Sequence, residues 1–313
     1  MKHIIYAVLV VCFIANGILL SQPVIQSNVN PTVPSTTSAE DAQKLLAEQQ
    51  RIADSIKIAR QWKPSGITGA NISQVYFKDW VQGGDNSLAW NIFLNLGLDK
   101  EWESWKLKNQ LKTIYGMMKL GDLQFRGNEN EFFLENLLAY KLKWKLDPYF
   151  SNTIQTLLLD AYTYTDSTSE LVSTFFDPGY ITQSLGFMFD DEAGFTFRIG
   201  AALKETFTNR FRSFSNNGDP NGEKTFLFET GLESVITYKK QIMENIIYDG
   251  RLRAFSRFNS LDVWDVRFDN NIAAKINKYI SVNFTAIIIH EIAQTRRTQL
   301  KQGLQIGLSY LIF

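Results

Sequence analysis

The feature that most constrains this chain is a strict alternation of apolar and other side chains. From residue 88 to residue 98 every even position is apolar, whereas the odd positions include Asn91, Asn95 and Gly97. Side chains that alternate with a period of two lie on opposite faces of a β-strand. This run is far longer than the average strand of about five or six residues. It predicts a long strand with one apolar face and one mixed face.

The same alternation returns along the rest of the chain from Gly66 onward. It predicts about twelve strands, over residues 71–80, 87–98, 103–117, 131–146, 149–164, 180–189, 194–205, 224–238, 246–258, 262–276, 279–290 and 298–313. One strand and one connection in roughly 20 residues is typical of outer-membrane barrels. The expected fold is all-β, an antiparallel up-and-down transmembrane β-barrel with an N-terminal α-helical extension.

A soluble β-sandwich is the alternative fold, and the lengths of the connections weigh against it. Connections after odd-numbered strands are mostly long and those after even-numbered strands are short, as in 118–130, 165–179 and 206–223 against 99–102, 147–148 and 190–193. Long loops on one side and tight turns on the other are typical of membrane barrels. We therefore expect the long loops to face the cell exterior.

Aromatic side chains separate into two levels along the predicted strands. Trp105 and Trp144 fall near the turns, and Trp90 and Tyr115 fall near the long loops. Two such levels predict the aromatic girdles of a membrane barrel. The last strand ends in Phe313, and we interpret Tyr310 and Phe313 as the C-terminal signal that the barrel-insertion machinery reads.

The N-terminal part has a different character. Lys2 and His3 precede the apolar run 4–20, which is typical of a secretory signal peptide, and an uncleaved anchor is the alternative. We expect a signal peptide over 1–21 that includes Cys12, the single cysteine of the chain. Residues 22–39 are expected to form a flexible linker, 40–62 a periplasmic helix, and 63–313 the barrel.

Several blocks of the chain resemble a known family. Residues 62–66, 71–77 and 80–87 resemble the opening of a Bacteroidota outer-membrane β-barrel family that is catalogued only as a domain of unknown function, and 175–180 and 241–246 resemble later blocks of it. The resemblance covers about 62–313. It implies an outer-membrane location in such a bacterium, and it supplies no activity.

Composition excludes several functions. The 32 basic and 32 acidic side chains balance, so no basic face for nucleic acid is expected. One cysteine and two histidines leave little material for metal or nucleophilic sites, and we expect no cofactor, no metal site and no enzymatic activity. Residues 83–87 are interpreted as a tight turn and 190–192 as an acidic turn. His290 leaves an outer-leaflet lipid hydrolase as the weakest alternative.

Charged residues at the predicted inward positions carry the functional hypothesis. They form two walls: Lys106, Lys108, Lys112, Lys141, Lys143 and Lys145 on one, and Glu229, Glu233, Arg251, Arg253, Asp265 and Asp269, which are near enough to pair, on the other. In the lysine wall only Glu135 is expected to provide a local counter-charge.

These walls predict a narrow passive channel or binding barrel for small polar or anionic solutes, surrounded by outer-membrane lipid. The alternative is a non-conducting structural or assembly protein that binds an envelope partner through helix 40–61 or the outer loops. A lumen plugged by paired charges would favour that alternative.

Overall fold

The structure is a computed structural model that describes residues 44, 46–51, 62–79, 81, 84–142, 144–165, 168–215, 222–292, 295 and 297–313. The chain divides into two units, residues 1–55 and 56–313. In the first unit, residues 44 and 46–51 are helical and lie within the predicted helix 40–62. The predicted signal peptide 1–21 and linker 22–39 lie outside the described residues. No helix among the described residues is long and apolar enough to cross a membrane.

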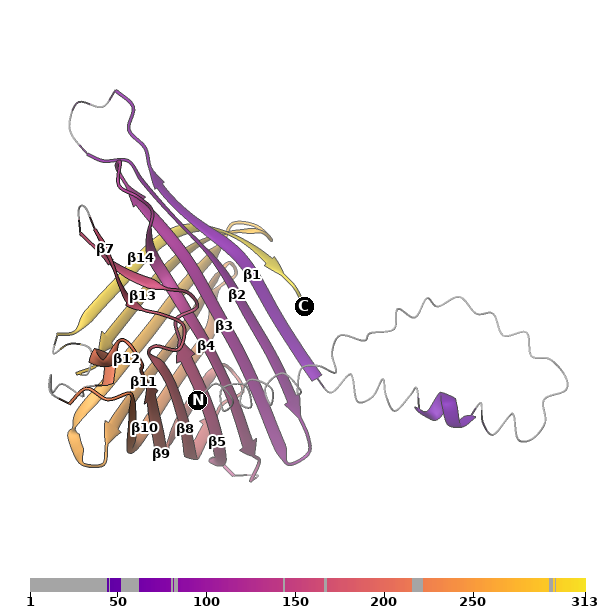
Figure 1. Ribbon diagram of the computed structural model, residues 1–313. Helices are drawn as coiled ribbons and strands as arrows, with labels where there is room; N and C mark the ends of the chain where they lie inside the picture. Colours follow the sequence, from indigo (N-terminus) through magenta and orange to yellow (C-terminus); the bar gives the residue numbers. More distant parts are fainter. Residues whose placement is uncertain are drawn as a thin grey trace, which may run out of the picture. The chain divides into compact units, whose positions relative to one another are not determined.

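Twelve antiparallel strands close a barrel in the second unit (Figure 1), which confirms the predicted fold class. Sequence neighbours pair, except that β5 pairs with β8 and β1 with β14. The strands are β1 Trp62–Val75, β2 Ser87–Glu101, β3 Trp105–Leu120, β4 Arg126–Tyr140, β5 Asp147–Thr156, β8 Gly179–Asp190, β9 Phe195–Phe207, β10 Phe226–Met243, β11 Ile246–Arg257, β12 Ser260–Lys275, β13 Ile280–His290 and β14 Gln299–Leu311.

The first strand lies earlier than the alternation predicted. β1 begins at Trp62, which pairs with Lys100, and ends at Val75, so residues 76–79 belong to a longer connection to β2. Pro64 weakens the strand pattern in this segment. It is tolerated because Pro64 pairs with β2 on one side, whereas the ladder to β14 begins only at Ile67.

The fourth and fifth strands also differ from their predicted ranges. β4 ends at Tyr140, and the described residues of 141–146 form a turn in which Leu142 N donates to Asp147 Oδ1 over 3.0 Å. β4 also begins earlier than predicted, at Arg126, so the connection after β3 is residues 121–125 and the prediction of a long loop over 118–130 is wrong. β5 ends at Thr156, and the chain then forms β6 Ala161–Tyr164 and β7 Ser169–Ser173, a two-stranded sheet outside the barrel ladder. The 3-10 helix η1, Arg212–Ser215, lies between β9 and β10.

We call the side of the barrel with the connections after β2, β4, β8, β10 and β12 the turn end, and the opposite side the loop end. Aromatic rings pair at both ends on the outward-facing positions, with Trp105 and Tyr140 4.9 Å apart at the turn end and Phe207 and Phe226 5.1 Å apart at the loop end. Apolar side chains such as Leu185 remain exposed between them. This outer surface has the girdles and apolar band of a membrane barrel.

Candidate functional site: the interior of the barrel

The ladder registers identify which face of each strand lines the interior. Asn91 of β2 pairs in register with Gly116 of β3, and its side chain bonds to Gln305 of β14, two strands away in the other direction. Glu135 of β4 bonds to Arg251 of β11, on the far side of the barrel. These positions share one parity through the ladder. It places on the inner face Lys106, Lys108, Lys112, Glu229, Glu233, Arg251, Arg253, Asp265 and Asp269.

The structure does not bring together the predicted lysine wall. Lys106 lies opposite Ala139, and β4 ends at Tyr140, which pairs with Trp105, the first residue of β3. Lys141 sits in the turn and pairs with Glu101 over 2.9 Å, and Lys145 is exposed in the same turn. Lys143 lies outside the described residues. The prediction of lysines 141 and 145 on an inner strand wall is therefore wrong, because the β3–β4 ladder ends at the pair Trp105 and Tyr140.

Two of the lysines on β3 share one carboxylate near the turn end. Lys106 and Lys108 both donate to Asp190 at the end of β8, over 2.7 and 3.0 Å. Lys112 lies deeper along the same face. The acidic turn at residues 190–192 thus contributes a carboxylate to the interior.

Mid-height in the barrel, Glu135 joins three strands. Its carboxylate accepts from Arg198 of β9 over 2.6 Å and from Arg251 of β11 over 2.8 and 3.0 Å. We call Glu135, Arg198 and Arg251 the central cluster. The guanidinium of Arg251 also lies 5.0 Å from the ring centroid of Phe133. The predicted role of Glu135 as counter-charge to the lysines is wrong, because the arginines reach it across the lumen.

Two further carboxylates of β4 make similar contacts nearer the loop end. Glu131 accepts from Arg267 of β12 over 2.9 Å, and Glu129 accepts from Lys301 of β14 over 2.6 Å. Because inward positions alternate, Glu129, Glu131 and Glu135 lie at successive heights along one strand. β4 therefore provides acceptors for cations from four other strands, β9, β11, β12 and β14.

A second ion-pair group fills the wall formed by β9 to β12. Glu233 pairs with Arg253 over 2.7 Å, Arg257 contacts Glu229, and Arg257 also pairs with Asp265 over 3.0 Å. The sequence predicted cross-strand pairing on this wall. Arg251 and Asp269 do not pair with each other: Arg251 pairs with Glu135, and Asp269 pairs with Arg267 over 2.9 Å.

Lys204 of β9, which the sequence analysis missed, completes this group. It is buried and lies 2.8 Å from Glu291, just beyond β13, and 3.5 Å from Asp265. Burial disfavours the ionised carboxyl of Glu291, but the Lys204 ammonium outweighs that effect and lowers the pKa of Glu291. The loop that follows β13 is thus tied to the inner wall.

A cavity of about 260 Å³ lies at the loop end between β4, β12, β13 and β14; we call it the loop-end cavity. Its lining is charged at Glu129, Glu131, Arg267 and Lys301. Ile287 and Ile289 of β13 lie between the two cations, because Ile289 pairs with Arg267 and Ile287 with Lys301. The central cluster lies further along β4 toward the turn end. The cavity is therefore separated from the turn end by the cross-lumen ion pairs.

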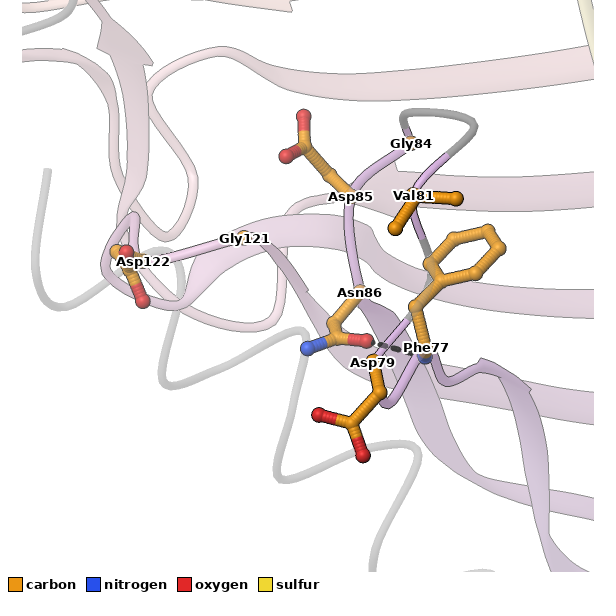
Figure 2. Close-up of a pocket in the computed structure, with 8 residues that line it drawn as sticks. All are labelled: Phe77, Asp79, Val81, Gly84, Asp85, Asn86, Gly121 and Asp122. Atoms are coloured by element: carbon orange, nitrogen blue, oxygen red, sulfur yellow. Dashed lines mark hydrogen bonds between the residues drawn. The ribbon is translucent and has the colours of Figure 1, made fainter.

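A larger cavity of about 590 Å³ lies at the β1–β2 connection (Figure 2). Asp79, Asp85 and Asp122 line it, but their carboxylates point in different directions, and Asn86 Oδ1 accepts from Phe77 N over 2.6 Å. No group of three or more His, Cys, Asp and Glu among the described residues is arranged to hold a metal ion. Gly84 has φ +121°, but the connection from Val75 to Ser87 is longer than the tight turn that was predicted over residues 83–87.

Two other sequence-predicted features have clear positions. His290 Nδ1 lies 3.2 Å from Thr298 Oγ1 at the exposed loop end, on an outward-facing position. Tyr310 pairs with Thr68 of β1, and the chain continues beside β1 because Ile312 N donates to Gly66 O over 2.8 Å. Phe313 lies against Gly66, where a side chain would collide with its ring.

Residues 72–162 match a family described as "Protein of unknown function (DUF3078)". No curated protein matches the chain significantly. The translocator domain of the autotransporter NalP from Neisseria meningitidis is similar in structure, with 9% identity, 88% of this chain and 99% of that chain covered, and a TM-score of 0.32.

Two porin-type structures are similar at the same level. The NanC porin has 11% identity, a TM-score of 0.37, and 79% of this chain and 98% of that chain covered. An outer-membrane channel from Pseudomonas putida F1 has 9% identity and a TM-score of 0.36, with 79% and 94% covered. Similarity at this level says nothing about function.

Proposed function

We propose that this protein is an outer-membrane β-barrel that acts as a narrow channel for small polar solutes and that is closed at rest by the central cluster. The supporting observation is the set of bonds from Glu135 to Arg198 and Arg251, which join opposite walls of the barrel at mid-height. A polar inner face suits a polar solute, and the apolar outer face with its aromatic levels suits lipid.

The same proposal includes the N-terminal residues, the insertion signal and the location of the barrel in the cell. Residues 1–21 are a signal peptide removed on export, and the helix around residues 46–51 lies in the periplasm, where it is available to a partner. The barrel-insertion machinery reads Tyr310 and Phe313. The long loops 157–178 and 208–225 face the cell exterior, and the source is a bacterium of the Bacteroidota.

The proposed solutes differ from those that the sequence favoured. A lysine strip would have selected anions, but Asp190 pairs with Lys106 and Lys108, and Glu101 with Lys141. Charges that are paired contribute little net field to the lumen. We therefore propose small polar solutes without strong selection by charge.

A non-conducting structural barrel is the second candidate. The ion pairs of Glu129, Glu131 and Glu135 occupy three successive heights of the lumen, which favours a permanent plug. In that case the barrel would serve as a membrane anchor for its loops or its periplasmic helix.

Conductance in planar bilayers tests the channel. Wild-type protein is expected to show rare, small openings, and Glu135→Gln is expected to raise the open fraction because two arginines then repel each other in the lumen. The control is Glu244→Gln, in the exposed β10–β11 turn, which should behave like wild type. If folded wild type and Glu135→Gln both stay silent, the structural candidate replaces the channel.

A further inference from the structure

The junction of the first and last strands is closed over only part of its length. β1 and β14 pair from Ile67 and Leu311 to Ile72 and Ile306, which is the shortest ladder among the barrel strands described. Continuing that register would place residues 73–75 opposite 303–305. Both segments are strands and pair with β2 and β13 on their other sides, but not with each other. We call these two segments the split seam.

Four amide side chains mark the point where the split begins. Asn71 Nδ2 donates to Asn91 Oδ1 over 2.7 Å, Asn91 Nδ2 donates to Gln305 Oε1 over 2.9 Å, and Asn283 Nδ2 donates to Asn71 Oδ1 over 2.9 Å. They belong to β1, β2, β13 and β14. We call this group the amide latch, because it holds the four strands together beside the last paired residues.

Two glycines of β14 show how abruptly the close contact between β14 and β1 ends. A Cβ atom on Gly307 would collide with the amides of Asn71 and Asn283. A Cβ atom on Gly303 would have only Thr285 Oγ1 nearby, at 3.4 Å, and nothing of β1. The strands are in close contact at Gly307, whereas space is open at Gly303.

The loop-end cavity lies beside this open part of β14. Lys301 faces inward and lines it, and so does Leu300, which belongs to the outward-facing parity. The cavity lining ends at Lys301, two residues along β14 from the split seam. The polar interior therefore comes close to the part of the wall where β1 and β14 do not pair.

In a membrane this gap requires an occupant. Backbone N–H and C=O groups without ladder partners are costly against hydrocarbon, which offers no hydrogen bonds. An occupant that satisfies the site has polar atoms for the edges, a charged head for the cavity and an apolar part for the lipid side. Those are the properties of an amphiphile.

We propose that the split seam and the loop-end cavity form a lateral binding site for a single-chain amphiphile with a zwitterionic head group. The proposal rests on the membrane location given under Proposed function. The head group lies among Glu129, Lys301, Glu131 and Arg267, whose charges balance and suit a head of both signs. The chain leaves past Gly303 of β14 through the split seam.

The size of the cavity favours one chain. About 260 Å³ lies slightly below the range of about 300–1,000 Å³ for pockets that enclose a drug-sized ligand. It accommodates a head group, while the chain extends outside. The central cluster lies between this cavity and the turn end, so a chain held in the cavity leaves on the loop side, where the split seam lies.

Binding of lysophosphatidylcholine, titrated by calorimetry into the full-length mature protein in a nonionic detergent, tests the site. Ile289→Trp fills the cavity and should weaken binding at least tenfold. Ile288→Trp, one residue away on the outward face, is the matched control and should bind like wild type. Gly303→Leu, which fills the open space in the split seam, should weaken binding as Ile289→Trp does and serves if that variant fails to fold.

Other outcomes would overturn the proposal. Phosphocholine binding as tightly as lysophosphatidylcholine would assign the cavity to a soluble solute. Equal loss in Ile288→Trp and Ile289→Trp would mean lipid adsorbed on the outer surface. Conductance is measured on the same variants: channel openings without amphiphile binding contradict only the lateral site, whereas binding in a barrel that never conducts contradicts only the channel.

Discussion

The central cluster and the split seam differ in how the strands of one barrel contact each other. At the central cluster, side chains from β4, β9 and β11 meet across the lumen, and Arg198 and Glu135 are buried. At the split seam, neighbouring strands β1 and β14 do not pair, although both continue. Contacts that hold this barrel together are therefore not confined to strands that are adjacent in the sheet. Side chains of strands five places apart meet across the lumen, whereas the two strands that close the barrel pair over only part of their length.

The largest effect is expected at the central cluster. Glu135→Gln removes the acceptor of two buried arginines and should lower the free energy of unfolding by about 3–5 kcal/mol, as when one member of a buried ion pair is removed. Urea unfolding in phosphatidylcholine vesicles measures it, with Glu244→Gln as control. A loss below about 1 kcal/mol would mean that water in the lumen already solvates these charges and that this wall is no firmer than the seam.

The second-largest effect on stability is expected on β2, which pairs with β1, and it differs between the outward and inward faces of β2. Leu94→Arg places a charge against hydrocarbon and should cost about 2–4 kcal/mol. Asn95→Arg, the adjacent inward position, should cost less because its charge enters the polar interior. The same vesicle titration compares them. Equal costs would contradict either the facing of β2 or the membrane location of the barrel.

A smaller effect compares the two halves of the seam itself. Gly307→Ala introduces a methyl group into the amide latch and should cost about 1–3 kcal/mol, as overpacking does. Gly303→Ala meets open space and should change stability by less than about 0.5 kcal/mol. Heat-induced loss of the compact band on gels ranks the two variants. If Gly303→Ala is as harmful as Gly307→Ala, the seam is closed along its whole length.

The smallest effect is expected for an ion pair outside both regions. Lys63 and Glu101 lie 3.2 Å apart at the turn end, and the Lys63 side chain is 70% exposed. Exposed pairs contribute about 0–1 kcal/mol, so Lys63→Ala should be close to wild type in urea. A cost comparable to that of Glu135→Gln would show that burial does not explain the difference between the pairs.

The fold was predictable because lipid and lumen impose a period of two on every strand. The prediction failed where that pattern is interrupted or outlasts the strand. Pro64 and Gly66 hide the start of β1, and the alternation runs on through 141–145 after β4 has ended. Strand ends depend on how neighbouring strands align, and alternation carries no information about alignment.

The interior was predictable as a set of inward charges but not as a set of partners. Glu129 and Glu131 occupy odd-numbered positions of β4, as Glu135 does, so the alternation alone places all three on the inner face. Only Glu135 was predicted there. The partners Arg198, Arg267 and Lys301 come from strands that are neither sequence neighbours nor sheet neighbours of β4. Such contacts depend on the curvature of the closed barrel, which no local pattern encodes.

The amide latch also bears on the order in which the strands of the barrel pair. Asn283 and Asn71 bond although 212 residues separate them, whereas most other junctions are hairpins closed by short connections. Entropy makes loop closure more costly with length, but only by about 0.6 kcal/mol for each doubling, so the distance delays this contact more than it weakens it. When strands pair in chain order, β13 and β14 join the sheet before β1 meets its last partner. In that order, the junction that forms last is the one that the barrel holds with the fewest ladder pairs.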